Sequence, residues 1–169
     1  ILLLALIAIT SLAVDIGYVM ATRNELQNVA DAGALAGARK LGTLYEELGP
    51  GSQDGFVCDP TTIVPVVQET GTLNTAAGEN VGINAGDVVI GQWDSTTRTF
   101  AATLTQPNAV KVTAHRDGSA NGPITTFFAQ VINIPTVPLA AEAIAALTGE
   151  STSDPLDLEI PVGISLEWF

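Results

Sequence analysis

Cysteine, histidine and aromatic residues are all scarce in this chain of 169 residues. The single cysteine, Cys58, excludes an internal disulfide, so it is either a free, partly buried thiol or a link between two chains. Aromatic residues make up only 5% of the sequence, whereas there are 16 glycines and 9 prolines. This composition favours a loop-rich β domain over a helical bundle.

Positive charge is also scarce, with 6 basic against 18 acidic residues and a net charge of -12. Residues 1–41 contain three residues of each sign, so the excess lies in the remainder, which has 3 basic and 15 acidic residues. The sequence therefore predicts a neutral N-terminal segment and an acidic head. Such a head repels phosphate groups, which excludes nucleic acid as a partner.

Motifs of catalysis and cofactor binding are missing: there is no nucleophile elbow, no Walker-type loop and no dinucleotide fingerprint. His115 has no cysteine or carboxylate at zinc-ligand spacing and is interpreted as structural. Asp54, Asp59 and the group Asp154, Asp157 and Glu159 do not follow a calcium-binding pattern and are interpreted as solvated acidic loops. We therefore expect no enzymatic activity, no metal and no cofactor.

The chain opens with an apolar run that, read from residue 1 to 21, is just long enough to span a bilayer. No basic start or small-residue cleavage site is visible, so Ile1 is expected to be a mature end left after removal of a leader. The side chains expected to form a membrane or filament-core helix are Ile1, Leu2, Leu3, Leu4, Leu6, Ile7, Ile9, Leu12, Val14 and Ile16.

Asp15 interrupts this run. A carboxylate at membrane depth costs a few kcal/mol and normally faces a partner or water. One interpretation pairs Asp15 with a cation of a neighbouring copy, either its α-amino group or its Arg23. The other places Asp15 near the membrane surface, close to Tyr18. The sequence leaves both open.

Helical periodicity continues to Leu41, which defines a helix over residues 1–41 and a head over residues 42–169. Small residues line one side of the second half of this helix: Ala30, Gly33, Ala34, Gly37 and Ala38. Such a stripe permits close approach, either of a helix from another chain or of the chain's own head.

The head is predicted to be mostly antiparallel β structure, which makes the fold class α+β. Residues 49–60 should form a loop, and residues 88–104 a hairpin that turns at 94–96 and directs Trp93 and Phe100 toward a common core. A third strand is expected over 109–116 and a short helix covering a sheet face over 124–133. Residues 136–147 are ambiguous by themselves, because alanine and glutamate favour a helix.

Residues 157–168 alternate strictly between apolar and polar side chains, which is the cleanest strand signal in the chain. Pro161 marks it as an edge strand. Either the chain is cut short here, or a second subunit completes the sheet at this edge. The apolar face comprises Leu158, Ile160, Val162, Ile164, Leu166 and Trp168.

Two patches resemble the TadE/TadG-like proteins of tight-adherence (Flp-type) pilus systems. In the first, Asp15, Gly17, Tyr18, Leu26, Gln27, Ala30, Asp31 and Ala32 occupy the places of the family's Asp-Gly, aromatic, Leu-Gln and Ala-Asp-Ala pattern. In the second, which spans about residues 110–147, the fitting residues are Val110, Val112, Arg116, Phe127, Phe128 and Ala129.

The resemblance implies a pilin-like bacterial surface protein without enzymatic activity, and it favours a strand over residues 136–147. We expect a structural subunit of an extracellular adhesive filament, inserted in the inner membrane before assembly and surrounded by other copies of itself. The alternative is an assembly factor anchored in the inner membrane with a periplasmic head. Ala5 departs from the glutamate that standard type IV pilins carry at this position, so either Asp15 substitutes for that charge or the subunit is not a standard pilin.

Overall fold

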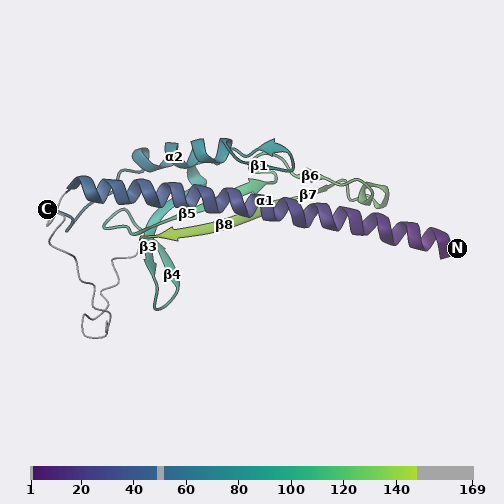
Figure 1. Ribbon diagram of the computed structural model, residues 1–169, viewed down its shortest axis with the longest axis horizontal. Coiled ribbons are helices and arrows are strands. Elements are labelled where there is room, and N and C mark those ends of the chain that lie inside the picture. Colours follow the sequence, from purple (N-terminus) through teal and green to yellow (C-terminus); the bar gives the residue numbers. More distant parts are fainter. Residues whose placement is uncertain (1, 49–51, 148–169) are drawn as a thin grey trace, which may run out of the picture.

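The structure, a computed structural model, describes residues 2–48 and 52–147 (Figure 1). Its longest element is α1 (Leu2–Leu48), a helix of 47 residues. No proline occurs before residue 50, and alanine and leucine, which favour helices, are abundant in this segment. The predicted helix is confirmed, and it continues past Gly42 to Leu48. At about 1.5 Å per residue it is roughly 70 Å long.

A second helix, α2 (Pro60–Thr72), was not anticipated from the sequence. It begins at Asp59, whose carboxylate accepts a hydrogen bond of 2.9 Å from the backbone N–H of Thr61. Pro60 follows at the first helical position, where its missing N–H is not needed. Ile63 and Val67 are fully buried in the core.

Four antiparallel strands form the main sheet in the order β4-β3-β5-β8. They are β3 (Val88–Asp94), β4 (Thr99–Ala102), β5 (Ala109–Arg116) and β8 (Leu139–Ala146). The predicted hairpin is confirmed, with Trp93 directly opposite Phe100. The common core expected for these two rings is wrong, because both are only partly buried and neither belongs to the hydrophobic core. The strands expected over 109–116 and 136–147 are also confirmed, the latter pairing with β5.

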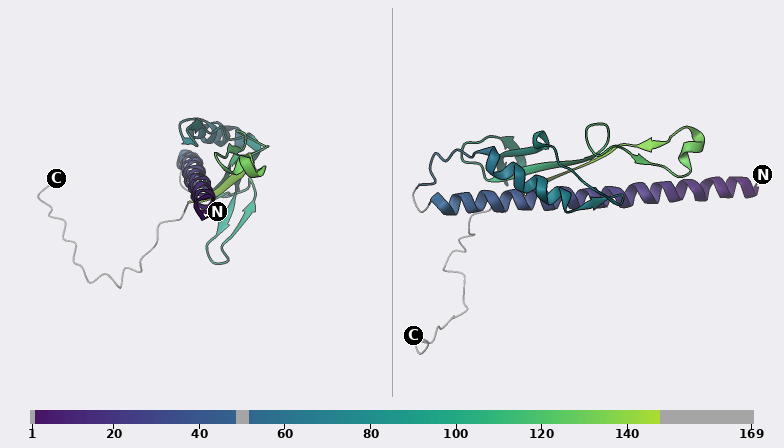
Figure 2. Two further views of the ribbon diagram at one scale, coloured as in Figure 1. Left: turned by 90° about the vertical axis from the view of Figure 1, so that its right-hand side faces the viewer. Right: turned by 90° about the horizontal axis from the view of Figure 1, so that it is seen from above.

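One face of this sheet is covered by both helices, which produces a two-layer α+β head (Figure 2). The core between the layers takes Leu26, Val29 and Leu41 from α1 and Val110 and Val112 from β5. On the opposite face of β5, Lys111, Thr113 and His115 are only partly buried. The head is therefore held to the second half of α1 by apolar packing on one side of the sheet.

Short elements connect these layers. The first two-stranded sheet is β1 (Thr75–Ala76) with β2 (Glu79–Asn80), and the 3-10 turn η1 (Ala85–Asp87) leads into β3. The second two-stranded sheet is β6 (Ile124–Thr125) with β7 (Thr136–Val137). Between β6 and β7 lies η2 (Ala129–Ile132), a single 3-10 turn.

The helix predicted over 124–133 is wrong in both length and position. Only η2 is helical there, and it lies along the N-terminal half of α1, beyond the end of the main sheet (Figures 1 and 2). The backbone is turned back at Asn133, which has a left-handed φ of 68°. Residues 126–134 therefore form a loop that extends the head along α1 toward its N-terminus.

Candidate functional site

The N-terminal end of α1 projects beyond the rest of the described chain and carries exposed apolar side chains (Figure 1). The exposed fraction is 85% for Leu2, 68% for Leu3 and 67% for Ile9. Large apolar side chains that are exposed in this number normally mark a contact with another molecule or with lipid. The other exposed members of the predicted set are Leu6, Leu12, Val14 and Ile16, whereas Ile1 lies outside the described residues.

Asp15 differs from its neighbours because it is buried, with 3% of its surface exposed. Its carboxylate accepts three hydrogen bonds from consecutive backbone N–H groups, at 2.7 Å from Phe127, 2.9 Å from Phe128 and 2.5 Å from Ala129. These are the groups at the start of η2 that have no partner within that turn. Asp15 thus caps a turn that lies more than a hundred residues later in the chain.

The electrostatics of this contact favour the charged carboxylate. Burial by itself raises the pKa of Asp15, but the hydrogen bonds from Phe127, Ala129 and Phe128 together outweigh it and lower the pKa below its ordinary value. Asp15 is therefore ionised at neutral pH, and its charge is stabilised within the chain.

Aromatic and aliphatic side chains surround the capped turn. The rings of Tyr18 and Phe127 pack edge to face with centroids 5.2 Å apart. On the other side of Asp15, Leu12 of α1 and Phe128, Val131 and Ile132 of the loop line a hollow of about 300 Å³. Val131 is 85% exposed, so the loop adds its own apolar surface to that of α1.

One of the two interpretations pairs Asp15 with a cation of a neighbouring copy, and Arg23 is exposed on α1. However, the three N–H groups already satisfy the carboxylate within its own chain. Pairing with Arg23 of another copy stays a prediction. Asp15 and residues 127–129 belong to the two sequence patches that carry the family resemblance. The sequence gives no sign that these two patches are in contact.

Residues 1–40 match the protein family described as Putative Flp pilus-assembly TadE/G-like. This segment is similar to members of that family. The resemblance stated for the first 41 residues is confirmed, while the one for residues 110–147 lies outside the match and stays a prediction. In the same comparisons, no curated protein and no solved structure is detectably similar to the chain.

The match indicates involvement in Flp-type pilus assembly, at the cell envelope or surface and in association with pilus components. The family is one of assembly and structure rather than of catalysis. Within the described residues, none of the helices has the combination of length and apolarity that crossing a membrane requires.

The small residues of the TadE/G-like segment pack against the chain's own head. Ala30, Ala34 and Ala38 are buried, and the two glycines between them face β5 and α2. A Cβ atom on Gly37 would lie 2.8 Å from Val110 and 3.0 Å from Val67. Of the two alternatives for this stripe, the structure therefore shows the intramolecular one.

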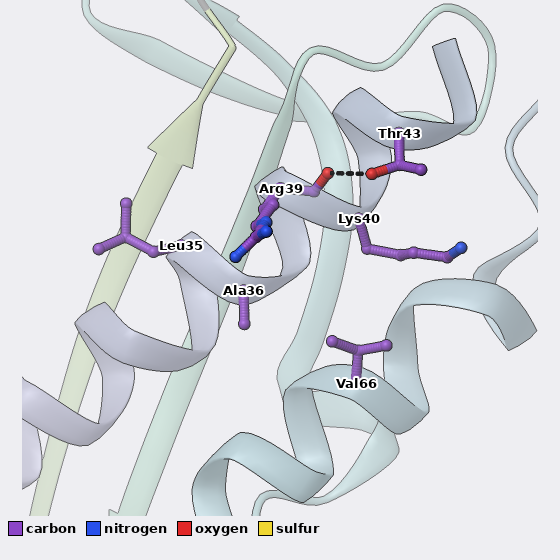
Figure 3. A pocket seen from close by; sticks show the side chains of 6 residues that line it. All are labelled: Leu35, Ala36, Arg39, Lys40, Thr43 and Val66. Atoms are coloured by element: carbon purple, nitrogen blue, oxygen red, sulfur yellow. Dashed lines mark hydrogen bonds between the residues drawn. The ribbon is translucent and has the colours of Figure 1, made fainter. Parts of the chain in front are cut away.

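A neighbouring side of the same helical segment borders a shallow hollow of about 480 Å³ toward α2 (Figure 3). Leu35, Arg39 and Lys40 of α1 and Val66 of α2 line it. Among the described residues, no carboxylate lies within ion-pair distance of Arg39 or Lys40. This hollow therefore offers two positive charges and little enclosure.

The remaining candidates for chemistry have structural roles. His115 lies 2.8 Å from a carboxylate oxygen of Asp117 and 3.4 Å from one of Asp87, at the end of β5. Asp59 caps α2, and Cys58 is a buried free thiol. Over residues 2–48 and 52–147, no cluster of three or more potential metal ligands occurs. Asp154, Asp157 and Glu159 lie outside the described residues.

Proposed function

We propose that this chain is a structural subunit of an extracellular Flp-type pilus, and that it polymerises through the N-terminal part of α1. The observation that supports this most is the division of α1 into two parts. From Thr22 onward its apolar stripe is buried in the head, whereas Leu2, Leu3, Leu6 and Ile9 are exposed. Helices of neighbouring copies would cover these side chains in the filament.

Charge supports the same arrangement. Residues 1–14 carry no ionisable side chain, so many copies can be packed together there without bringing like charges close. The head contains the acidic excess and would form the outer surface, where water and salt screen repulsion between copies. Asp15 marks the border between the two zones, and its charge is already compensated by backbone N–H groups.

The alternative is an assembly factor that stays at the inner membrane with its head in the periplasm. It would use the same exposed residues against lipid or against a few partner helices, and it would occur in few copies. The filament proposal is preferred because the loop at residues 126–134 adds Phe128, Val131 and Ile132 beside α1. Other copies packed around α1 would cover these side chains as well.

The first experiment shears material from the cell surface and examines it by electron microscopy and mass spectrometry. Filaments that contain this chain as a major component are the expected result. Recovery of the chain only from the inner-membrane fraction would instead favour the assembly factor.

A pair of matched variants tests the role of α1 in the cell. Leu6→Glu places a charge among the exposed residues of the N-terminal end and should abolish filaments while the chain is still produced. Leu73→Glu changes a leucine that is also exposed, at 77%, but lies on the head, and it should leave filament yield unchanged. Equal yields from the two variants would contradict polymerisation through α1.

A further inference from the structure

The loop at residues 126–134 exposes large apolar side chains beside α1, away from the main sheet (Figures 1 and 2). The exposed fraction is 85% for Val131, 65% for Ile132 and 56% for Phe127. Side chains of this kind normally contact another molecule or lipid. The hydrogen bonds and charges of the loop indicate which of the two it contacts.

The backbone of this loop is paired almost entirely within the chain. Three N–H groups donate to Asp15 and four to backbone carbonyls, so seven of the nine N–H groups at residues 126–134 have a partner. Side chains also donate to carbonyls of the loop, from the Thr126 hydroxyl to Ile134 at 2.6 Å and from the Gln130 amide to Phe127 at 2.8 Å. An exposed loop in water does not need this pairing, because water supplies partners, whereas lipid supplies none.

Ionisable side chains are rare in both chain segments at this end of the described structure. Asp15 is the only one in residues 1–22, and residues 118–141 contain none. Asp15 is only 3% exposed, because the loop covers its carboxylate. The carboxylate and the three N–H groups satisfy one another, so neither is left facing apolar surroundings. α1 and the loop thus form one apolar end with a single, covered charge.

We propose that the loop at residues 126–134 enters the lipid of a bilayer beside the N-terminal part of α1 before the chain is assembled with its partners. A protein interface exchanges about one hydrogen bond per 100–200 Å². Lipid acyl chains need no such bonds, and they fit around a protruding loop whose backbone donors are already paired. Because this step precedes assembly, it applies equally to the filament subunit and to the assembly factor.

The residues near the loop indicate its depth. The ring of Tyr18 packs on Phe127, and an aromatic side chain with a polar tip is typical of a membrane surface. Arg23 is the next ionisable residue of α1 and can reach lipid phosphate groups. Ser11 and Leu12, which border the hollow under the loop, precede Tyr18 by about 10 Å of helix. With α1 along the membrane normal, the loop lies at about the 5–10 Å depth of interfacial insertions.

A fluorescent label reports whether the loop enters lipid. In a Cys58→Ala background, Val131→Cys is labelled with an environment-sensitive nitrobenzoxadiazole dye, and the chain is reconstituted into phosphatidylcholine vesicles at high lipid excess. Leu6→Cys reports on α1, and Leu73→Cys, which is 77% exposed on the head, is the matched control. At positions 131 and 6 the emission should shift to the blue and be quenched by lipids with a nitroxide on the acyl chain. Neither change should occur at position 73.

Quenching at position 6 without quenching at 131 would overturn the proposal, because α1 would then enter lipid without the loop. The absence of quenching at both positions would overturn it as well. A blue shift at 131 that occurs only at a high ratio of protein to lipid would assign the loop to a second copy instead. Filament yield from cells is scored separately, so loss of the filament function is distinguishable from failure of the loop to enter lipid.

The unmodified chain gives an independent answer if a labelled variant fails to fold. In nanodiscs that contain the same nitroxide lipid, the amide resonances of residues 127–134 should be broadened, as should those at the N-terminal end of α1. The amide of Leu73 on the head should stay sharp. Sharp resonances at 127–134 together with broadened ones at residues 2–9 would overturn the proposal.

Discussion

The carboxylate of Asp15 accepts a hydrogen bond of 2.7 Å from the backbone N–H of Phe127, although 112 residues separate the two in the sequence. This contact joins the TadE/G-like segment to the loop at residues 126–134. It also explains how a charged residue is tolerated within an apolar helix, since the backbone of the same chain supplies its partners. The loop and its exposed apolar side chains thereby keep a fixed position along α1.

Asp15→Ala should release this loop without unfolding the head. The substitution leaves three N–H groups at residues 127–129 without an acceptor, whereas the apolar packing of α1 from Thr22 to Leu48 is untouched. Amide exchange at residues 127–129 should accelerate, the Tyr18–Phe127 ring contact should be lost, and filament yield should fall. Asp54→Ala, at an exposed loop position, is the control. Unchanged exchange and unchanged yield would contradict this role of Asp15.

The same contact should respond to acid. The pKa of Asp15 is lowered below the ordinary 3.8, so the hydrogen bonds favour the ionised form. Their contribution is complete above about pH 4 and is lost only as the pH falls through the lower pKa of the folded state. Amide exchange at 127–129, corrected for its intrinsic pH dependence, should be constant from pH 7 to 4 and accelerate below that. Since the pKa of Asp117 is also lowered, Asp15→Asn serves as the reference and should lack this step.

Alternation predicted β5 well because this strand has one buried face, whereas the strand at 136–147 was expected from the family resemblance. β3, β5 and β8 turn every second residue toward the helices, and their sequences record that geometry. The apolar residues at 127, 128, 131 and 132 also have helical spacing, but the tertiary contacts of the loop limit the helical part to four residues. The Asp59-Pro60 start of α2 is a readable helix signal, although Pro65 interrupts the helical pattern five residues later.

The site itself was only half predictable. The exposed apolar residues of α1 and the unusual position of Asp15 are both visible in the sequence. The partner of Asp15 is not, because a backbone N–H group has no residue signature and any loop can supply it. The same limit applies to the small-residue stripe, whose spacing fits a neighbouring helix as well as it fits Val67 and Val110 of the chain's own head.

Gly37→Ala should destabilise the head, even though alanine is the better helix former. The added methyl group would lie 2.8 Å from Val110 and 3.0 Å from Val67, two stiff side chains in the core. Overpacking of this kind costs about 1–3 kcal/mol, while the gain in helix propensity is at most about 1 kcal/mol. We expect the free energy of unfolding to fall by about 1–2 kcal/mol in urea titrations followed by circular dichroism.

Gly17→Ala is the matched control on the same helix. Nothing lies within 4 Å of the Cβ position at Gly17, so the only expected effect there is the higher helix propensity of alanine. This variant should be as stable as the parent or more stable by up to about 1 kcal/mol. A stabilising Gly37→Ala would show that α1 does not pack on β5 and α2 as closely as described.

Cys58 should be inert in the folded chain and reactive once the chain unfolds. Its side chain is buried, with 1% of its surface exposed, and burial together with the neighbouring Asp59 raises the pKa of the thiol. Both effects reduce the supply of accessible thiolate, the species that attacks thiol reagents and forms disulfides. A chromogenic disulfide reagent at pH 8 should therefore label the native chain roughly tenfold or more slowly than the urea-unfolded chain. Rapid labelling of the native chain, or Cys58-linked dimers in sheared filaments, would show that this thiol is accessible for links between subunits.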